Sequence, residues 1–191
     1  MKKAFVNGTE ITAGAVQFEL DRLVRFYESH GVSKDEIDKS RPQLEDKALE
    51  QAIGAKLLID RALKLDVPVT AADVDAEVEK VVAQVGGLDN YRKALEAQGL
   101  SEKAFRRELE RGAKVNKLVA QACASTPEPT ESEVVAYWEA NKALFSEGGQ
   151  RTLVDVHDQI KDLLRHAARG RVMDAFIAEL REKADVRYEG R

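Results

Sequence analysis

Residues 42–65 read PQLEDKALEQAIGAKLLIDRALKL, and this stretch decides the fold. Pro42 suits the first turn of a helix, and the DVPV segment at 66–69 ends that helix at about Leu65. Its apolar side chains are too numerous for one seam against a single neighbour: Ala48, Leu49, Ala52, Ile53, Leu57, Leu58, Ile59, Ala62 and Leu63. We therefore expect a central helix that is covered on more than one side.

Further helical patterns flank this central helix on both sides. Thr12 can cap a helix with an apolar stripe, Ser33 and Glu36 form a capping-box pattern, and Thr70 opens a helix rich in valine. Ser101 can cap the next long helix, which extends to about residue 121. The expected stripe after Thr12 consists of Val16, Leu20, Leu23, Val24 and Tyr27, and that after Thr70 of Val74, Val78, Val81, Val82 and Val85.

Two breaks divide the second half of the chain. The prolines of TPEP at 126–129 favour an extended linker, after which T-E-S-E at 130–133 is a further capping box. The helical pattern fails again at 146–150 and resumes from about Leu153 in a long last helix, in which Gly170 marks a point of bending. The sequence thus predicts three parts: residues 1–126, 127–150 and 151–191.

The two ends of the chain carry the only strand patterns. Residues 3–6 are short and apolar and precede an Asn7-Gly8 turn, and DVRY at 185–188 alternates polar with apolar side chains. Pairing these segments in an antiparallel ribbon would close the helical body. The expected fold class is therefore mainly α, with a short antiparallel β ribbon that joins the N- and C-terminal segments.

Composition narrows the functional classes. The 191 residues are 43% apolar and 34% charged, which is typical of a helix-rich globular protein, and the net charge of −4 does not favour binding to nucleic acid or to an anionic membrane. No apolar run of seven or more follows the lysines of MKKAFVNG, and no stretch approaches the length of a membrane span. Either Met1 is the native start and the protein is cytoplasmic, or a targeting segment preceded this sequence.

No motif for catalysis or for binding a metal or cofactor is apparent. Cys123 is the only cysteine, and His30, His157 and His166 are too far apart in sequence to share a helical turn. Phosphate-binding glycine loops, G-x-S-x-G and H-E-x-x-H are all missing. We expect no enzyme, no metal and no cofactor. A basic row, Lys103, Arg107, Arg111 and Lys114, indicates either a solvated helix face or a contact with anions or acidic clients.

Four segments in order resemble the SurA, PrsA and PpiD group of secretory chaperones. They are FVNGTEITAGAVQFELDRL at 5–23, ALEQAIGAKLLIDRALKLDVPVTAADVDAEVEKV at 48–81, LDNYRKALEAQGLSEKAFRRELERGAKVNKLV at 88–119 and TESEVVAYWEANKALF at 130–145. In that group the last segment leads into a parvulin prolyl isomerase domain. Here only SEGGQRT follows before the last helix begins, so the isomerase domain and its activity are not expected, whether the loss is natural or designed.

The resemblance implies an ATP-independent holdase, which binds unfolded or extended segments of exported proteins in the periplasm or elsewhere outside the cytoplasm. Exposed aromatic and apolar side chains would contact many clients weakly. The candidate client-binding residues are Phe26, Tyr27, Tyr91, Phe105, Tyr137, Trp138 and Phe145, and ordinary core packing is the competing interpretation for each. The other functional hypothesis is a helical interaction module with one fixed partner or a second copy, including a homodimer that exchanges the long last helix.

Overall fold

The computed structural model describes residues 2–146 and 151–190. The chain divides into two compact units. One contains residues 1–118 and 177–191, and the other contains residues 119–176. We call them unit 1 and unit 2 and describe each by itself. The expected break at 146–150 lies largely outside the described residues, and the division of the sequence after residues 126 and 150 stays a prediction.

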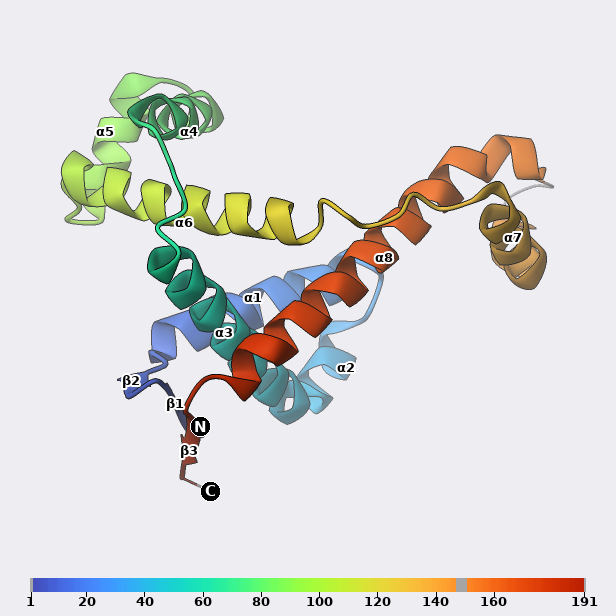
Figure 1. The fold of residues 1–191 in the computed structure, drawn as a ribbon, viewed down its shortest axis with the longest axis horizontal. Helices are drawn as coiled ribbons and strands as arrows, with labels where there is room; N and C mark the ends of the chain where they lie inside the picture. Colours follow the sequence, from blue (N-terminus) through green and yellow to red (C-terminus); the bar gives the residue numbers. More distant parts are fainter. Residues whose placement is uncertain (1, 147–150, 191) are drawn as a thin grey trace. The chain divides into compact units, whose positions relative to one another are not determined.

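Unit 1 combines a small sheet with a series of helices (Figure 1). Helices α6 and α8 each extend from unit 1 into unit 2. The elements that lie wholly or partly in unit 1 are β1 (Lys3–Val6), β2 (Thr9–Glu10), α1 (Ala13–Ser29), α2 (Lys34–Lys39), α3 (Arg41–Lys64), α4 (Ala71–Gln84), α5 (Leu88–Ala97), α6 (Glu102–Ala122), α8 (Leu153–Glu182) and β3 (Val186–Glu189).

The helix starts follow from local side chains. The Thr12 hydroxyl accepts a hydrogen bond from the Ala15 backbone N–H at the start of α1. Full capping boxes open α2, with Ser33 and Glu36, and α4, with Thr70 and Asp73. Pro42 lies in the first turn of α3, where the backbone N–H that proline lacks has no partner within the helix. These starts are where the sequence predicted them.

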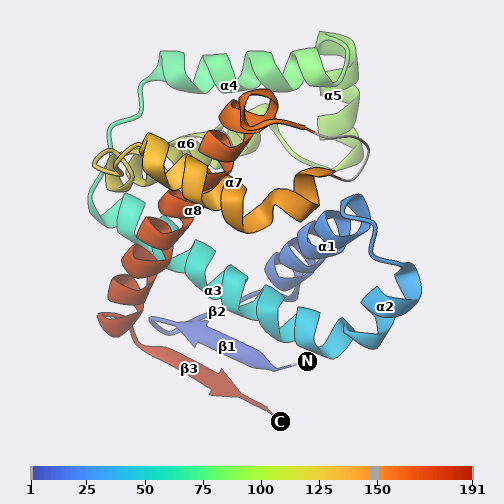
Figure 2. The same cartoon turned by 90° about the vertical axis from the view of Figure 1, so that its right-hand side faces the viewer.

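The predicted pairing of the chain ends is confirmed. Strand β1 lies between β2 and β3, and both of its neighbours are antiparallel to it (Figure 2). In the pairing with β3, Phe5 lies opposite Arg187 and Val6 opposite Val186. Asn7 and Gly8 both have positive φ, of 50° and 78°, which produces the tight turn into β2. The sequence analysis missed β2, which has only two residues.

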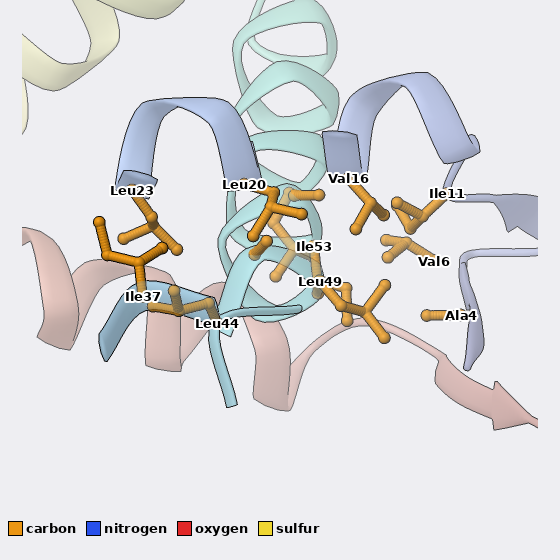
Figure 3. Close-up of a cluster of buried hydrophobic side chains, with 13 residues drawn as sticks. Ala4, Val6, Ile11, Val16, Leu20, Leu23, Ile37, Leu44, Leu49 and Ile53 are labelled. Carbon is orange, nitrogen blue, oxygen red and sulfur yellow. The ribbon is translucent and has the colours of Figure 1, made fainter. Parts of the chain in front are cut away.

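The core of unit 1 surrounds the first half of α3. Figure 3 shows Leu49 and Ile53 of α3 facing Val16 and Leu20 of α1, with side chains of β1 at one end. From the last part of the chain, Ile177, Leu180, Ala184 and Val186 pack against the same cluster. Helix α3 is therefore covered on several sides by elements from both ends of the sequence. Its later residues are less covered, since Leu58 and Ile59 are half-buried and Leu63 is exposed.

A polar network reinforces the closure of the sheet. Arg181 at the end of α8 donates to a Glu50 carboxylate oxygen at 2.6 Å, and the Tyr188 hydroxyl of β3 donates to the other oxygen at 2.7 Å. Hydrogen bonding to Glu50 raises the pKa of Arg181, and burial, followed by the bond to Glu50, raises the pKa of Tyr188. Glu50 of the central helix thus contacts both the last helix and the last strand.

Ion pairs link α4 and the loop before it to α6. Lys117 donates to Asp73 at 2.7 Å, Arg106 pairs with Asp75, and Lys114 lies 3.3 Å from Asp66. The valine stripe of α4 is only partly covered. Val74 is buried, the next three valines are half-buried, and Val85 is exposed. This part of unit 1 therefore has less apolar packing than the core around α3.

Unit 2 consists of α7 (Glu131–Ser146) packed on the first part of α8. Its fully buried core is small and contains Val134, Val156 and Ile160. Helix α7 has a kink at Asn141, whose φ of −122° is not helical and whose side-chain amide donates to the Tyr137 carbonyl at 2.8 Å. A side chain that bonds within its own helix in this way is a common companion of a kink.

Substitutions at Gly54 test how closely α3 and α8 pack. A Cβ at Gly54 would lie 3.5 Å from Ile177 Cγ2 and 3.6 Å from its Cδ1, which is ordinary contact. Gly54→Ala should therefore stabilise the protein by about 0.5–1 kcal/mol through helix propensity. Gly54→Leu should destabilise it by about 1–3 kcal/mol through overpacking. Gly112→Leu is the control, because a Cβ at Gly112 would meet nothing within 4 Å. Chemical denaturation measures all three, and equal effects of the two leucine variants would contradict the close packing.

The contribution of Asp73 to stability can be tested at low pH. The hydrogen bond from Lys117, followed by those from Thr70, lowers the pKa of Asp73 to about 2. A lowered pKa in the folded state stabilises the protein above the unfolded value of about 3.9, and this contribution is lost as the pH falls towards 2.

Asp73→Asn should therefore lower the thermal midpoint, measured by circular dichroism, at pH 5, and the difference from wild type should shrink as the pH approaches 2. Glu79→Gln, an exposed change in the same helix, should show no such pH dependence. A difference between Asp73→Asn and wild type that is constant from pH 5 to 2 would count against the ion pair.

Candidate client-binding surfaces

Of the seven candidate client-binding residues, Phe26 and Tyr27 lie together at the end of α1. The Phe26 ring is 55% exposed, meets the Tyr27 ring edge-on at 5.7 Å and lies 4.2 Å from the His30 ring, measured between centroids. Tyr27 is half-buried against the unit 1 core, and the Lys47 ammonium lies 5.9 Å from the centroid of its ring. Phe26 is therefore an accessible apolar surface, whereas Tyr27 joins that surface to the core.

A pocket of about 300 Å³ adjoins Tyr27. We call it the α1–α2–α3 pocket. Its apolar residues come from the end of α1, the following loop, α2 and α3, and Figure 3 shows two of them, Ile37 and Leu44, beside Leu23 of the core. The lining residues are Tyr27, Val32, Glu36, Ile37, Ser40, Gln43, Leu44 and Lys47. The pocket thus combines an apolar base with a polar rim.

Tyr91 and Phe105 pack together between α5 and α6. Their ring centroids are 5.7 Å apart, Tyr91 is only 3% exposed, and Phe105 is half-buried. Burial raises the pKa of Tyr91, and no partner for its hydroxyl is found among the described residues. The Tyr91 ring therefore serves as packing in this structure and offers a client little surface.

The basic row on α6 is partly engaged within the chain. Arg111 lies 3.0 Å from Glu108, and Lys114 contacts both Asp66 and Glu110. Lys103 and Arg107 are exposed, and neither forms an ion pair with the part of the chain that the structure describes. Two of the four cations thus have carboxylate partners on their own chain.

The other three predicted aromatic residues lie on α7 in unit 2. Tyr137, Trp138 and Phe145 are half-buried against the small core of this unit. The Lys142 ammonium lies 4.3 Å from the centroid of the Trp138 ring, and the Trp138 indole N–H has no acceptor among the described residues. Each ring thus keeps some accessible surface while contributing to the packing of α7 on α8.

Several exposed apolar side chains were missed by the sequence analysis. Phe18 of α1 is 62% exposed, and Leu144 of α7 is 66% exposed. Phe18 falls outside the stripe by which α1 packs on the core, so its position off that stripe was the available signal. Leu88, Leu100, Val135, Val154 and Leu163 are also exposed. Apolar surface is thus present on both units.

Unit 2 also contains a groove of about 510 Å³ between the end of α6, the proline linker and α8. Small residues, including Ala120, Ala124 and Gly170, line it together with Cys123 and Met173. Cys123 is half-buried and forms no disulfide. In residues 2–146 and 151–190 no group of three or more potential ligands could hold a metal ion, and no helix is long and apolar enough to cross a membrane.

Ion pairs join the start of α7 to α8. The basic side chains of His157, Lys161 and Arg165 recur every four residues along one face of α8. His157 Nε2 lies 2.7 Å from Glu131, Lys161 lies 3.1 Å from the same carboxylate, and Arg165 lies 2.8 Å from Glu128 in the linker. The hydrogen bond to Glu131, followed by that to Asp158, raises the pKa of His157.

Comparison with known proteins identifies the family. The SurA-like N-terminal domain family matches residues 2–119. The chain belongs to this family. The match covers the whole of unit 1 except for the end of α8 and β3, so the resemblance predicted from the sequence is confirmed. Membership of this chaperone family supports a chaperone function.

Two relatives of this SurA-like chain are longer proteins. The foldase protein PrsA of Clostridium perfringens is 28% identical in an alignment of 156 residues, and the match covers 74% of this chain and 43% of PrsA. The putative peptidyl-prolyl cis-trans isomerase NifM of Azotobacter chroococcum is 26% identical in an alignment of 168 residues, and the match covers 83% of this chain and 56% of NifM. The chain therefore spans about half the length of these relatives.

A solved structure supports the predicted fold class. It comes from work on the virulence factor PEB4 and the periplasmic protein Cj1289, described as two structurally related SurA-like chaperones of Campylobacter jejuni. The TM-score is 0.59, the match covers 99% of both chains, and the identity is 14%, so this likeness concerns the fold alone. The mainly helical, SurA-like fold with a small antiparallel sheet is thereby confirmed.

The His157 contacts predict a pH effect on unit 2. A raised pKa in the folded state stabilises the protein below the unfolded value of about 6.5, and this contribution is lost as the pH rises through the folded pKa. Trp138 is the only tryptophan, so its fluorescence reports on unit 2. The thermal midpoint of unit 2, followed by this fluorescence, should fall between pH 6 and pH 8.5 in the wild type. It should fall less in His157→Gln.

His166→Gln is the matched control for this measurement, because His166 is on the same helix and forms no ion pair with the described part of the chain. It should retain the wild-type pH dependence. If His157→Gln and His166→Gln behave alike, the pairing of His157 with Glu131 does not contribute to the stability of unit 2.

Proposed function

We propose that this protein is an ATP-independent holdase that binds unfolded or extended segments of exported proteins. The observation that carries the proposal is the apolar surface left exposed on both units, above all at Phe18, Phe26 and Leu144. Exposed apolar side chains that gather into a patch on a folded domain commonly mark sites of protein binding, and Phe18 and Phe26 both lie on α1. Side chains distributed over several helices suit clients that share no common sequence.

The sequence supports binding that needs neither nucleotide nor prolyl isomerisation. No phosphate-binding glycine loop is present, so binding and release would not depend on nucleotide hydrolysis. Only residues 147–152 separate α7 from α8, which leaves no room for a prolyl isomerase domain at this point of the chain. We therefore propose binding without prolyl isomerase activity, although one relative is named as a putative isomerase.

A location outside the cytoplasm is part of the same proposal. Its support is the family and the name of the periplasmic protein in the structural comparison. The clients would then be polypeptides that have crossed the membrane unfolded. Of the candidate aromatic residues, we propose the exposed Phe26 and the half-buried Tyr137, Trp138 and Phe145 of α7 as direct client contacts.

Aggregation of a chemically unfolded outer-membrane or secreted protein, followed by light scattering without ATP, tests the holdase function. The wild type at several-fold molar excess should suppress the scattering. The double variant Phe18→Ser, Leu144→Ser should suppress it less, because it removes two exposed apolar side chains. Glu79→Ser, an exposed change without apolar loss, should act like the wild type.

The same samples separate the alternative functions. A proline-containing peptide should isomerise at its uncatalysed rate in the presence of the protein. If the wild type leaves aggregation unchanged at several-fold excess but sediments as a tight, saturable dimer, the protein is an interaction module rather than a holdase.

A further inference from the structure

The α1–α2–α3 pocket combines an apolar base, a small volume and an unevenly charged rim. Ile37 and Leu44 at its base are at least 94% buried and belong to the core cluster of unit 1, so the surrounding packing holds the base in place. Its volume of about 300 Å³ is at the lower end of the range for small-molecule sites. A space of this size suits one large side chain rather than a folded partner.

The two charged residues on the rim differ in their availability. The Glu36 carboxylate accepts hydrogen bonds from the Ser33 backbone N–H at 3.1 Å and from the Ser33 hydroxyl at 2.6 Å. These bonds lower the pKa of Glu36 and direct its charge to the start of α2. Lys47 forms no ion pair with any described residue, and its ammonium lies 5.9 Å from the centroid of the Tyr27 ring. The rim therefore carries a cation without a carboxylate partner and a carboxylate that is already hydrogen-bonded to Ser33.

Two neutral polar side chains complete the rim. Neither the Ser40 hydroxyl nor the Gln43 amide has a hydrogen-bond partner in the part of the chain that the structure describes. Both groups can donate and accept hydrogen bonds, and the backbone of an extended polypeptide offers both kinds of partner. Contacts of this type hold a chain without selecting its sequence, so selection would come from the apolar base and from Lys47.

We propose that the α1–α2–α3 pocket binds one large aliphatic side chain of an extended polypeptide, with an acidic residue next to it paired with Lys47. The polypeptide backbone contacts Ser40 and Gln43, and Phe26 extends the apolar surface beyond Tyr27. This inference rests on the proposed holdase function and specifies a class of client segment: an aliphatic residue adjacent to a carboxylate in an unfolded chain.

Photo-crosslinking of a peptide to the full chain tests the pocket, because a covalent crosslink can report weak binding. The probe is a ten-residue Gly/Ser peptide that carries one diazirine analogue of leucine followed by glutamate. Mass spectrometry should place most crosslinks on Tyr27, Val32, Ile37 and Leu44. The exposed substitution Gln43→Trp should reduce their yield at least five-fold by covering the pocket, whereas Lys39→Trp, an exposed change in α2 that is not part of the lining, should leave it unchanged.

A charge exchange tests the role of Lys47 without altering the apolar base. Replacing the glutamate of the probe by lysine should lower the crosslink yield several-fold with the wild type. With Lys47→Glu the preference should reverse, so that the lysine probe gives the higher yield, and the difference should shrink at high salt. A variant that merely disturbed folding would lower both yields together and would not reverse the preference.

Aggregation assays on the same preparations separate this inference from the proposed function. If the wild type suppresses aggregation but the crosslinks fall elsewhere, the pocket assignment is overturned and the holdase function stands. The same conclusion follows if Gln43→Trp gives the wild-type crosslink yield. If the crosslinks map to the pocket but aggregation is unaffected, the pocket assignment stands and the holdase function fails. Should Gln43→Trp change only the sedimentation coefficient and not the peptide crosslinks, the pocket holds a second copy of the chain, which also overturns the proposal.

Discussion

The pairing of β1 with β3 is the constraint on which the closed form of unit 1 depends. It joins the two ends of the chain, and Asn7 and Asp185 add two hydrogen bonds beside the strands. Closing so long a loop costs entropy, which must be offset by the contacts it permits. Those contacts include Ile177, Leu180 and Ala184 against the core and Arg181 and Tyr188 on Glu50. Without this pairing, one side of α3 would lose its cover.

The distribution of apolar packing is uneven, and the proposed function depends on that unevenness. The thirteen buried residues of the unit 1 core contrast with three in the core of unit 2. Burial in the unit 1 core supplies much of the stability of the folded state, since buried apolar area is the main favourable contribution to folding. Side chains such as Phe18 and Leu144 can then stay exposed without a loss of structure. The proposed holdase function is therefore compatible with a stable fold.

Charged residues perform two tasks in this arrangement. Many close the ends of helices, as Asp73 and Glu133 do in their capping boxes, or link neighbouring helices, as Glu131 does between α7 and α8. These interactions orient neighbouring helices at a small energetic gain per pair. Lys47 differs, because it lies at the rim of a pocket and has no carboxylate partner among the described residues.

The amino-acid sequence alone determined the helices and their starts, because caps such as Thr12 and Ser33 and the stripe that includes Val16 and Leu20 act over one or two turns. It also indicated the terminal ribbon, with the help of the resemblance to the SurA group. Strand β2 was missed because two residues, Thr9 and Glu10, carry no detectable alternation.

The tertiary structure alone decided which aromatic and apolar residues are accessible. Tyr91 is buried against Phe105 from another helix, whereas Phe26 is 55% exposed and has no such cover. The α1–α2–α3 pocket likewise exists only because the chain turns between α1 and α3 and brings Ile37 beside Leu44. Local periodicity indicated that Phe18 lies off the buried stripe of α1, but cover by another helix and the concavity of a surface depend on tertiary contacts.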